Sequence, residues 1–426
     1  MASTANAAAG RAAGDGLFIG GEWVAPAAGG SFPTLNPATG EKMFDVPAAT
    51  APDADRAVAA AREAFENPKW SRMDAADRGT LLWRVADAIE ARAGELARLE
   101  TMDNGKPIRE AQIDIAMAVD TFRYFAGWCT KLEGDTIPVR GNVLNYTLRE
   151  PLGVVACIVP WNFPLLMACY KIAPALACGN TVIVKPAEQT PVTILELAAI
   201  MQQVGVPAGV FNVLPGKGSI VGAALVRHPG VDKIAFTGST EVGKQIMKEA
   251  ADTLKKVSLE LGGKSPNIVL ADADLDAAAR GAFSAIFYNN GQCCTAGSRL
   301  LIADSVREEV LSKVVDRAKK MVPGDPLDPK TRMSPVISQA QLDSVLSYVE
   351  KGKAEGADLL TGGARVEGNN GFWIQPTVFD NVGIDFTISQ EEIFGPVLAA
   401  IPFTDEAEVV ALANRSIYGL AAAVWT

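Results

Sequence analysis

The segment 290–298, which reads NGQCCTAGS, places two adjacent cysteines in a turn flanked by glycines. A free thiol has a pKa of about 8.5 and is only slightly ionised at neutral pH, so a cysteine nucleophile needs electropositive surroundings. Backbone amides or a neighbouring positive charge could supply them. The alternative is that Cys293 and Cys294 pack as small buried hydrophobic groups, which is ordinarily the better interpretation of such a pair. The spacing alone therefore makes them candidates for nucleophilic catalysis and no more.

Two other segments carry polar groups that suit acyl chemistry. In the segment 259–264 (LELGGK), Glu260 stands among apolar residues and glycines, where burial would raise its pKa and suit it to general-base work. In the segment 160–164 (PWNFP), Asn162 is held between two prolines, and an amide fixed in this way is a ready hydrogen-bond donor to an oxyanion. The alternatives are a capping or ion-paired glutamate and a loop asparagine that bonds its own backbone.

Three segments have the composition of ribose- and phosphate-binding turns. Lys185 and Glu188 follow a β-type run, and a carboxylate at the end of a parallel strand can accept hydrogen bonds from both hydroxyls of a ribose while repelling a 2′-phosphate. The segments 216–222 (GKGSIVG) and 238–243 (GSTEVG) could each present a helix N-terminus to a phosphate. Neither has the G-x-G-x-x-G spacing. A surface ion pair or a plain capping turn explains each segment equally well when it is taken singly.

The elements that must position these residues alternate between short apolar strands and helices from residue 151 onward. This alternation predicts parallel sheets covered on both faces, with ligands at the strand-to-helix turns. The expected strands are 153–159, 181–185, 209–214, 233–237, 267–270, 299–302, 373–379 and 397–403, and the expected helices are 190–204, one from 219, one from 241, 274–290, 304–320 and 338–355. Before residue 151 the patterns predict a strand at 17–23, helices at 53–66, 74–100 and 110–132, and a hairpin across 134–150.

The amino-acid composition argues against nucleic acids, metals and membranes as partners of this protein. The 426 residues carry a net charge of −10, which argues against a nucleic-acid partner because phosphate backbones are bound by basic stripes. A single histidine, His228, excludes multi-histidine metal sites, so we expect no metal and a carboxylate base. Six cysteines without C-x-x-C spacing indicate a reducing, cytoplasmic setting. The uncharged run 152–170 could cross a membrane by its length, but Pro160 and Pro164 interrupt it, so we expect no membrane segment.

Together and in this order the motifs are distinctive, and the chain resembles the aldehyde dehydrogenase superfamily (NAD(P)-dependent, hydrolytic) from about residue 17 to its end. The resemblance is carried by PWNFP (160–164), KPAEQTP (185–191), FTGSTEVG (236–243), LELGGKSP (259–266), GQCCTAGSR (291–299) and EEIFGP (391–396). It implies an α/β fold with two Rossmann-like open parallel-sheet domains, cofactor and catalytic, plus a small β oligomerisation flap. The implied domains are a disordered tail at 1–16, an NAD-binding domain at 17–132 and 152–261, an oligomerisation hairpin at 133–151 and a catalytic domain at 262–426.

The resemblance also implies a role for each motif residue. It makes Cys294 the nucleophile, Glu260 the general base and Asn162 the oxyanion donor. The implied cofactor contacts, from the adenine ribose through the pyrophosphate to the nicotinamide, are Lys185, Glu188, Gly238, Ser239, Glu392 and Phe394. The implied substrate-tunnel residues are Phe163, Met167, Tyr170 and Tyr288.

The implied activity is the oxidation of an aldehyde to a carboxylic acid with NAD. In the family the thiolate attacks the aldehyde carbonyl, an amide stabilises the oxyanion of the thiohemiacetal, hydride passes to NAD, and a base activates the water that hydrolyses the thioester. The presence of Glu260 favours hydrolysis over transfer of the acyl group to coenzyme A. The presence of Glu188 favours NAD over NADP.

Several points stay open in the sequence. The aromatic tunnel residues suit aliphatic or aryl aldehydes, but they could also hold a trimethylammonium group by cation–π contact, as in betaine aldehyde oxidation. Family members typically continue beyond the position of Thr426, so we expect a C-terminal segment to be missing. A homo-oligomer, dimer or tetramer, is expected for a full-length member. The other function classes are an inactive truncated or structural homologue and a cysteine hydrolase that uses no cofactor.

Overall fold

The chain forms two compact units, which are described separately. The computed structural model describes residues 16–426, so the tail predicted at 1–16 lies almost wholly outside the described residues. The first unit comprises the chain up to Leu35, Lys42–Asp103 and Ala111–Glu260. The second comprises Asn36–Glu41, Asn104–Glu110 and Leu261–Thr426. The predicted α/β fold with two parallel sheets is confirmed, but nothing in the sequence indicated that two short early segments belong to the second unit.

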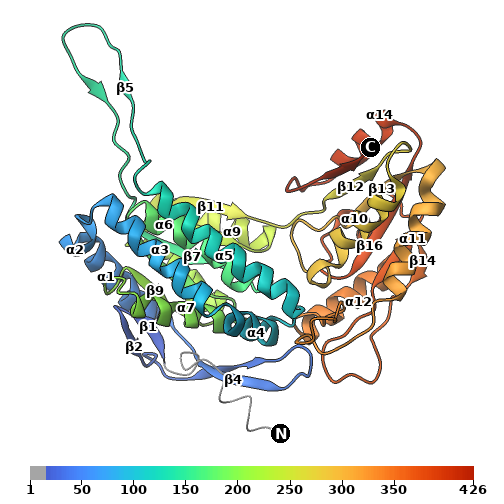
Figure 1. The fold of residues 1–426 in the computed structure, drawn as a ribbon, viewed down its shortest axis with the longest axis horizontal. Helices are drawn as coiled ribbons and strands as arrows, with labels where there is room; N and C mark the ends of the chain where they lie inside the picture. The colour runs from blue at the N-terminus through green and yellow to red at the C-terminus, as the bar shows by residue number, and fades with distance from the viewer. Residues whose placement is uncertain (1–15) are drawn as a thin grey trace. The chain divides into compact units, whose positions relative to one another are not determined.

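The first unit is built on a seven-stranded sheet with the order β11-β10-β7-β8-β9-β1-β2 (Figure 1). Its parallel strands are β7 (Val154–Ile158), β8 (Thr181–Lys185), β9 (Phe211–Val213), β10 (Lys233–Thr237) and β11 (Lys256–Glu260). Every residue of β7 and β8 is buried, which their runs of valine and isoleucine predict, because a parallel strand covered on both faces has no solvent side.

Helices of the first unit form two contacting groups. One contains α3 (Ala75–Ala91), α6 (Pro164–Ala177) and α7 (Val192–Gln203), and the other contains α1 (Ala51–Glu66), α8 (Ala223–Arg227) and α9 (Thr240–Ala250). The short α2 (Pro68–Ser71) follows α1, while α4 (Ala93–Asn104) and α5 (Ile108–Trp128) follow α3. A separate antiparallel pair is formed by β3 (Ser31–Leu35) and β4 (Lys42–Pro47).

Two predicted elements are each divided in the structure. The strand expected at 17–23 is a tight hairpin of β1 (Leu17–Ile19) and β2 (Glu22–Val24), because Gly20 and Gly21 turn the chain with φ of 66° and 84°. The helix expected at 74–100 is α3 followed by α4, with a break at Arg92. A third prediction is confirmed: β5 (Thr136–Ile137) and β6 (Asn145–Tyr146) pair as an antiparallel hairpin that extends away from its unit (Figure 1).

The second unit has a six-stranded sheet with the order β14-β15-β16-β13-β12-β17. The strands are β12 (Pro266–Val269), β13 (Arg299–Ala303), β14 (Asp358–Thr361), β15 (Thr377–Asp380), β16 (Val397–Phe403) and β17 (Ala423–Trp425), and β14 alone among them pairs antiparallel. The helices are α10 (Leu275–Phe287), α11 (Arg307–Lys319), α12 (Gln339–Ala354), α13 (Thr387–Gln390) and α14 (Glu406–Asn414). The sequence did not predict β14, β17, α13 or α14.

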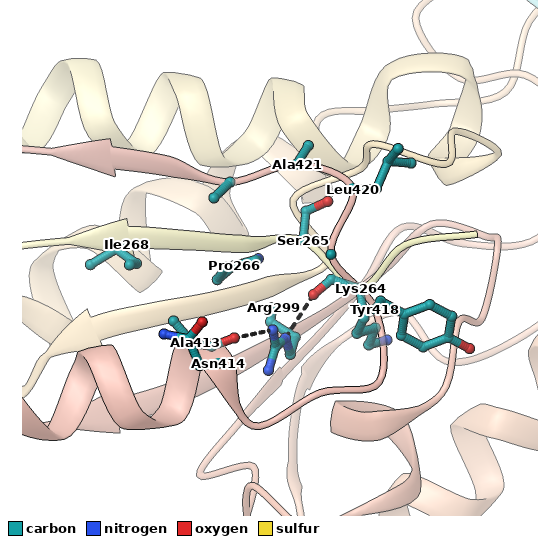
Figure 2. A pocket seen from close by; sticks show the side chains of 12 residues that line it. Lys264, Ser265, Pro266, Ile268, Arg299, Ala413, Asn414, Tyr418, Leu420 and Ala421 are labelled. Carbon is teal, nitrogen blue, oxygen red and sulfur yellow. Dashed lines mark hydrogen bonds between the residues drawn. The ribbon is translucent and has the colours of Figure 1, made fainter. Parts of the chain in front are cut away.

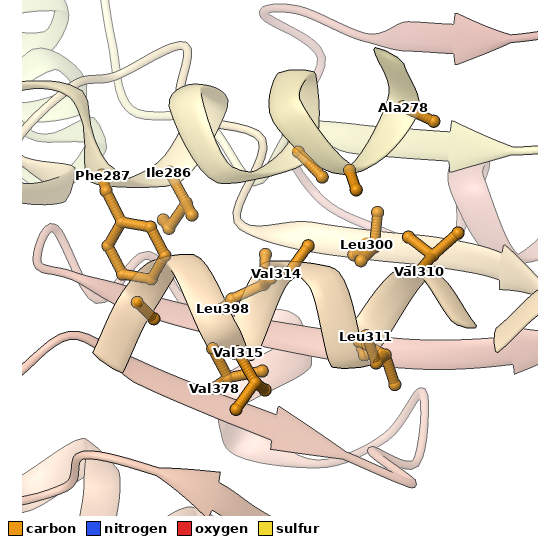
Figure 3. Close-up of a cluster of buried hydrophobic side chains, with 14 of the residues drawn as sticks. Ala278, Ile286, Phe287, Leu300, Val310, Leu311, Val314, Val315, Val378 and Leu398 are labelled. Carbon is orange, nitrogen blue, oxygen red and sulfur yellow. The ribbon is translucent and has the colours of Figure 1, made fainter. Parts of the chain in front are cut away.

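The period-2 alternation of the central strands divides the core of the second unit into two clusters. Leu300 and Leu398 face the buried residues of α10 and α11, as Figure 3 shows. Their neighbours Leu301 and Ala399 belong to the other cluster, which includes residues of α12 and α14. Apolar side chains on both faces of β13 and β16 therefore place these strands in the interior of the sheet.

The uncharged run 152–170 is divided among β7, a loop and the first part of α6, and Pro164 is the first residue of that helix. Among residues 16–426 no helix is long and apolar enough to cross a membrane. The six cysteines all fall within this range, and each is a free thiol.

Candidate active site

The two adjacent cysteines follow a turn with an uncommon backbone conformation. Helix α10 ends at Phe287, and the next residues, Tyr288–Gly291, include Asn289 (φ 46°, ψ 34°) and Asn290 (φ 54°, ψ 36°) in the left-handed region. Asparagine tolerates this region better than most residues and glycine tolerates it best, which accounts for the sequence NNG at this place. The predicted tunnel residue Tyr288 is half-buried at the start of the turn.

Contacts from other segments of the second unit fix this turn. A Cβ on Gly291 would lie 2.1 Å from the carbonyl oxygen of Gly395, so only glycine fits. The side-chain Oε1 of Gln292 accepts a hydrogen bond of 2.9 Å from the backbone N–H of Ile337. The next two residues are the half-buried cysteines. The turn therefore presents both thiols from a constrained backbone.

The two adjacent thiols interact, and the interaction shifts their pKa values in opposite directions. The interaction with Cys294 lowers the pKa of Cys293 to about 6 against an opposing effect of burial, and the Thr295 hydroxyl, 3.2 Å from the Cys293 sulfur, also lowers it. The same interaction and burial raise the pKa of Cys294. Because the thiols interact, the first ionisation belongs to the pair. The directions of the two shifts favour ionisation at Cys293, whereas the family resemblance makes Cys294 the nucleophile.

The ionisation of the pair leads to a first prediction. We expect the alkylation of the peptide that holds Cys293 and Cys294 by iodoacetamide to reach half of its maximal rate near pH 6, well below the value of about 8.5 for a free thiol. The rate rises with pH because the thiolate is the nucleophile. The measurement is mass spectrometry of the labelled peptide between pH 5 and pH 10, with the half-buried Cys178 peptide as an internal comparison, since burial raises the pKa of that thiol. A midpoint near pH 9 for both peptides would contradict the prediction.

Two glycines of the LELGGK segment let other site groups approach its backbone. A Cβ on Gly262 would lie 2.0 Å from Oε2 of Glu392, and a Cβ on Gly263 would lie 2.4 Å from the carbonyl oxygen of Cys294. The backbone N–H of Gly263 also donates to Oε1 of Glu392 at 3.2 Å. The glycine pair therefore joins the cysteine loop to the segment EEIFGP, which lies about a hundred residues further along the chain.

The predicted nicotinamide contacts Glu392 and Phe394 lie in the second unit with the cysteines. Burial raises the pKa of the Glu392 carboxyl, and the N–H of Gly263 opposes this shift. Phe394 has a φ of 57°, a strained conformation for a bulky residue, and its carbonyl oxygen accepts a hydrogen bond of 2.8 Å from the side chain of Gln341. Strain of this kind persists where neighbouring contacts hold it, and it is commonest at functional sites.

In the first unit the ends of β8 and β9 lead into two segments that meet. Lys185, the last residue of β8, is buried, and its ammonium lies 3.8 Å from Oε1 of Glu188. The same oxygen accepts a hydrogen bond of 2.6 Å from the backbone N–H of Gly218, where the helical segment that precedes α8 begins. Burial lowers the pKa of Lys185, and the charge of Glu188 opposes this. A carboxylate and an ammonium at the carboxyl edge of a parallel sheet fit the hydroxyls of a ribose.

Gly238 and Ser239 form the turn from β10 to α9. The Ser239 hydroxyl caps the helix by accepting a hydrogen bond of 3.3 Å from the N–H of Val242, and its side chain is exposed. The N–H of Gly238 donates to the carbonyl oxygen of Glu260 at 3.1 Å, which joins this turn to the end of β11. The N-terminus of an eleven-residue helix is thus exposed at the edge of the sheet, where an anion would be stabilised.

The predicted oxyanion donor and three tunnel residues gather at the start of α6. Asn162 is buried in the loop between β7 and α6, and Phe163 is the N-cap of the helix. Met167 is half-buried, and Tyr170, which is 42 % exposed, lies one turn further along the same side of the helix.

Glu260 lies in surroundings different from those expected. It is the last residue of β11 and its side chain is exposed, so apolar neighbours do not enclose it as the sequence indicated. The charged group beside it is Lys171 of α6. Burial lowers the pKa of Lys171, and the negative charge of Glu260 is among the effects that raise it. The strand end therefore offers the carboxylate a lysine rather than an apolar pocket.

The second unit also contains a cavity of about 430 Å³, which Figure 2 shows. No predicted site residue lines it. Arg299 closes one side and donates through Nε to the carbonyl oxygen of Lys264 at 2.8 Å and through a terminal nitrogen to that of Ala413 at 2.9 Å. Lys264 also lines the cavity, and its ammonium is buried with no hydrogen-bond partner among the described residues. The hydrogen bonds of Arg299 join β13 to the segment that precedes β12 and to the end of α14.

Sequence reasoning missed three contributors to the site, namely Gly218, Gly262 and Gly263. Each was visible as a glycine inside a noted motif, but its role depends on a contact with a distant segment. Of the predicted residues, the structure brings Lys185 together with Glu188, and Cys294 together with Glu392 through the two glycines.

Comparisons with known proteins agree with the motifs. The family model described as the aldehyde dehydrogenase family matches residues 23–426. Human retinal dehydrogenase 2 is 51 % identical over 413 residues, which cover 96 % of this chain and 80 % of that protein. The NAD⁺ complex of an aldehyde dehydrogenase from Bacillus cereus superposes with a TM-score of 0.95 at 48 % identity, covering 97 % of this chain and 84 % of the other. Betaine aldehyde dehydrogenase from Staphylococcus aureus gives a TM-score of 0.95 at 42 % identity, with 97 % and 82 % covered.

Proposed function

We propose, because this chain belongs to the aldehyde dehydrogenase family, that it oxidises an aldehyde to a carboxylic acid with NAD as the hydride acceptor. The observation that carries the proposal is the thiol pair on a constrained turn, with the Cys294 backbone against Gly263, whose N–H is bound by Glu392. A buried structural pair of thiols, the alternative interpretation, would have no need of a left-handed turn or of a lowered pKa.

The chain's own residues account for the binding and proton transfers that this reaction needs. The Cys294 thiolate attacks the aldehyde carbon, and the amide of Asn162 donates a hydrogen bond to the developing oxyanion. Loss of such a donor costs about 3 kcal/mol in the transition state. Glu260 takes a proton from the water that hydrolyses the thioester, and its exposed position at the end of β11 gives water access to it.

The residues of the first unit fit a dinucleotide. Glu188 and Lys185 would hold the adenine ribose, and the exposed N-terminus of α9 at Gly238 and Ser239 would face the pyrophosphate. Glu392 and Phe394 would hold the nicotinamide ribose and ring. NAD, when bound, supplies the hydride acceptor.

The carboxylate of Glu188 leads to a prediction on cofactor choice. We expect Glu188→Ser to change the ratio of kcat/KM for NAD to that for NADP by about tenfold or more in favour of NADP, because the variant removes the charge that repels a 2′-phosphate. The measurement is steady-state kinetics with both cofactors. Glu241→Ser, which removes an exposed carboxylate from the first turn of α9, is a control for net charge. An unchanged ratio in Glu188→Ser would show that Glu188 does not discriminate between NAD and NADP at the adenine ribose.

The substrate is an aldehyde with an apolar or aromatic body, in keeping with Phe163, Met167, Tyr170 and Tyr288. Betaine aldehyde is the second candidate, favoured by the likeness to the enzyme from Staphylococcus aureus and by aromatic rings that can bind a cation. Rates with propanal, benzaldehyde, retinal and betaine aldehyde test this choice. A preference for betaine aldehyde over propanal of tenfold or more would select the second candidate.

We infer that the protein forms a homo-oligomer held in part by the β5–β6 hairpin. All residues from 131 to 150 are exposed, and the hairpin carries the apolar side chains of Val143, Leu144 and Leu148, which are 67 %, 75 % and 70 % exposed. Exposed apolar side chains gathered in this way are typical of a protein–protein contact. The free thiols agree with a reducing compartment such as the cytoplasm.

A further inference from the structure

A short segment far from the cysteines in sequence reaches the turn that presents them. Residues Asn104–Glu110, between α4 and the first turn of α5, belong to the second unit. The N–H of Ile108 donates to the carbonyl oxygen of Pro326 at 2.8 Å, and Gly105 has a φ of 91° where a Cβ would lie 3.0 Å from side-chain atoms of Pro37 and Pro335. These contacts fix the segment in place.

Glu110 makes the contact that joins this segment to the turn. Its side chain is buried, with only 3 % of the residue exposed, and its Oε2 accepts a hydrogen bond of 2.8 Å from the backbone N–H of Asn289. Its other oxygen lies 3.2 Å from the guanidinium of Arg109. Lys106 of the same segment is buried too, and its charge is among the effects that lower the pKa of Cys293.

The turn needs an external support of this kind. Asn289 and Asn290 are consecutive left-handed residues, a conformation that costs energy at each position for any residue other than glycine. The side chain of Asn290 does not supply the support, because both its Nδ2 and its Oδ1 are buried with no hydrogen-bond partner in the described part of the chain. A buried carboxylate that accepts the N–H of Asn289 stabilises the first of the two left-handed residues directly.

We propose that Glu110 is a positioning residue for the cysteine nucleophile, because its carboxylate holds the left-handed turn at Asn289 and Asn290 from which the thiol pair is presented. Glu110 touches no reacting atom in this role. The inference rests on the proposed function, in which the thiol pair is the site of attack. It predicts that the position of the acceptor atom matters, rather than its charge alone.

Three substitutions at one position test the proposal. Glu110→Gln keeps an acceptor oxygen at the same reach and loses the charge, whereas Glu110→Asp keeps the charge and withdraws the oxygen by one methylene. Glu110→Leu removes the acceptor. The matched control is Asp120→Asn, which removes an exposed carboxylate from the same helix. Two readouts are measured for each variant: kcat with KM for both substrates, and the alkylation rate of the Cys293–Cys294 peptide at pH 9, which requires no turnover.

We expect Glu110→Asp and Glu110→Leu to lower kcat and the alkylation rate by about tenfold or more, with KM for NAD unchanged, because small misplacements of a reacting group have effects of this size. Glu110→Gln and Asp120→Asn should stay within about threefold of the parent chain. If Glu110→Leu does not fold, the comparison of Glu110→Asp with Glu110→Gln is sufficient to test the positioning role. An impaired Gln variant beside an intact Asp variant, or three intact variants, would overturn the proposal. A parent chain that forms no NADH would count against the proposed function, and the alkylation rates would still test Glu110.

Discussion

Cys294→Ala is expected to reduce aldehyde-dependent NADH formation by roughly 10³-fold or more, because it removes the sulfur that forms the covalent intermediate. The fold should persist, since the side chain is half-buried and its backbone, which contacts Gly263, is retained. The measurement is steady-state turnover at saturating NAD and aldehyde. The affinity for NAD, measured by the quenching of tryptophan fluorescence, should be unchanged.

The informative control for Cys294→Ala is the neighbouring substitution, Cys293→Ala. In the structure the interaction between the thiols lowers the pKa of Cys293 and raises that of Cys294. Its loss should move the pH at which kcat/KM is half-maximal downward, toward the value of about 8.5 for a single thiol, because the interaction that raises the pKa of Cys294 is removed. If Cys293→Ala abolishes turnover and Cys294→Ala retains it, the nucleophile is Cys293 and our assignment is wrong.

Glu260→Gln is expected to form one equivalent of NADH per site and then to stall. The acylation step does not need the carboxylate, whereas hydrolysis of the thioester needs a base, and general-base catalysis is worth roughly 10² to 10⁴-fold. The exposed position of Glu260 beside Lys171 means that the carboxylate works in contact with water. Stopped-flow absorbance should show a burst of normal amplitude followed by a slow steady phase.

Asp252→Asn is the matched control for Glu260→Gln, because it removes an exposed carboxylate shortly before the same strand. It should give steady turnover like that of the parent chain. Unchanged steady turnover in Glu260→Gln would remove Glu260 from the role of base. Mass spectrometry of the stalled enzyme should find the acyl group on the peptide that holds Cys294.

Local patterns predicted the strands and helices that carry strong periodicity. The valine and isoleucine runs of β7 and β8 were sufficient to predict these strands, because a parallel strand that is buried on both faces consists mainly of apolar residues. Arg92, where α3 ends and α4 begins, has no sequence signal as strong as proline or glycine, so the break was missed. The strand β17 was missed because it forms by pairing with β12, which lies more than 150 residues away, and a local sequence pattern does not reveal such a long-range contact.

The chemical residues of the site were visible in the sequence, but their surroundings were not. The motif around Glu260 indicated an apolar pocket, since its neighbours in sequence are leucines and glycines, yet alternate strand residues point to opposite faces and leave the carboxylate exposed. The contacts of Gly262 with Glu392 and of Glu110 with Asn289 join segments more than a hundred residues apart. No local pattern encodes such contacts, because each segment reads as an ordinary turn or helix start by itself.

The most direct test of the central claim is the absorbance of NADH when the purified chain is mixed with NAD and the panel of aldehydes, beside the Cys294→Ala variant. We expect NADH with at least one aldehyde, none without aldehyde, and none in the variant. A folded chain that binds NAD and forms no NADH with any of the aldehydes would contradict the claim for this polypeptide. NADH formation that persists in Cys294→Ala would contradict the assignment of Cys294 as the nucleophile.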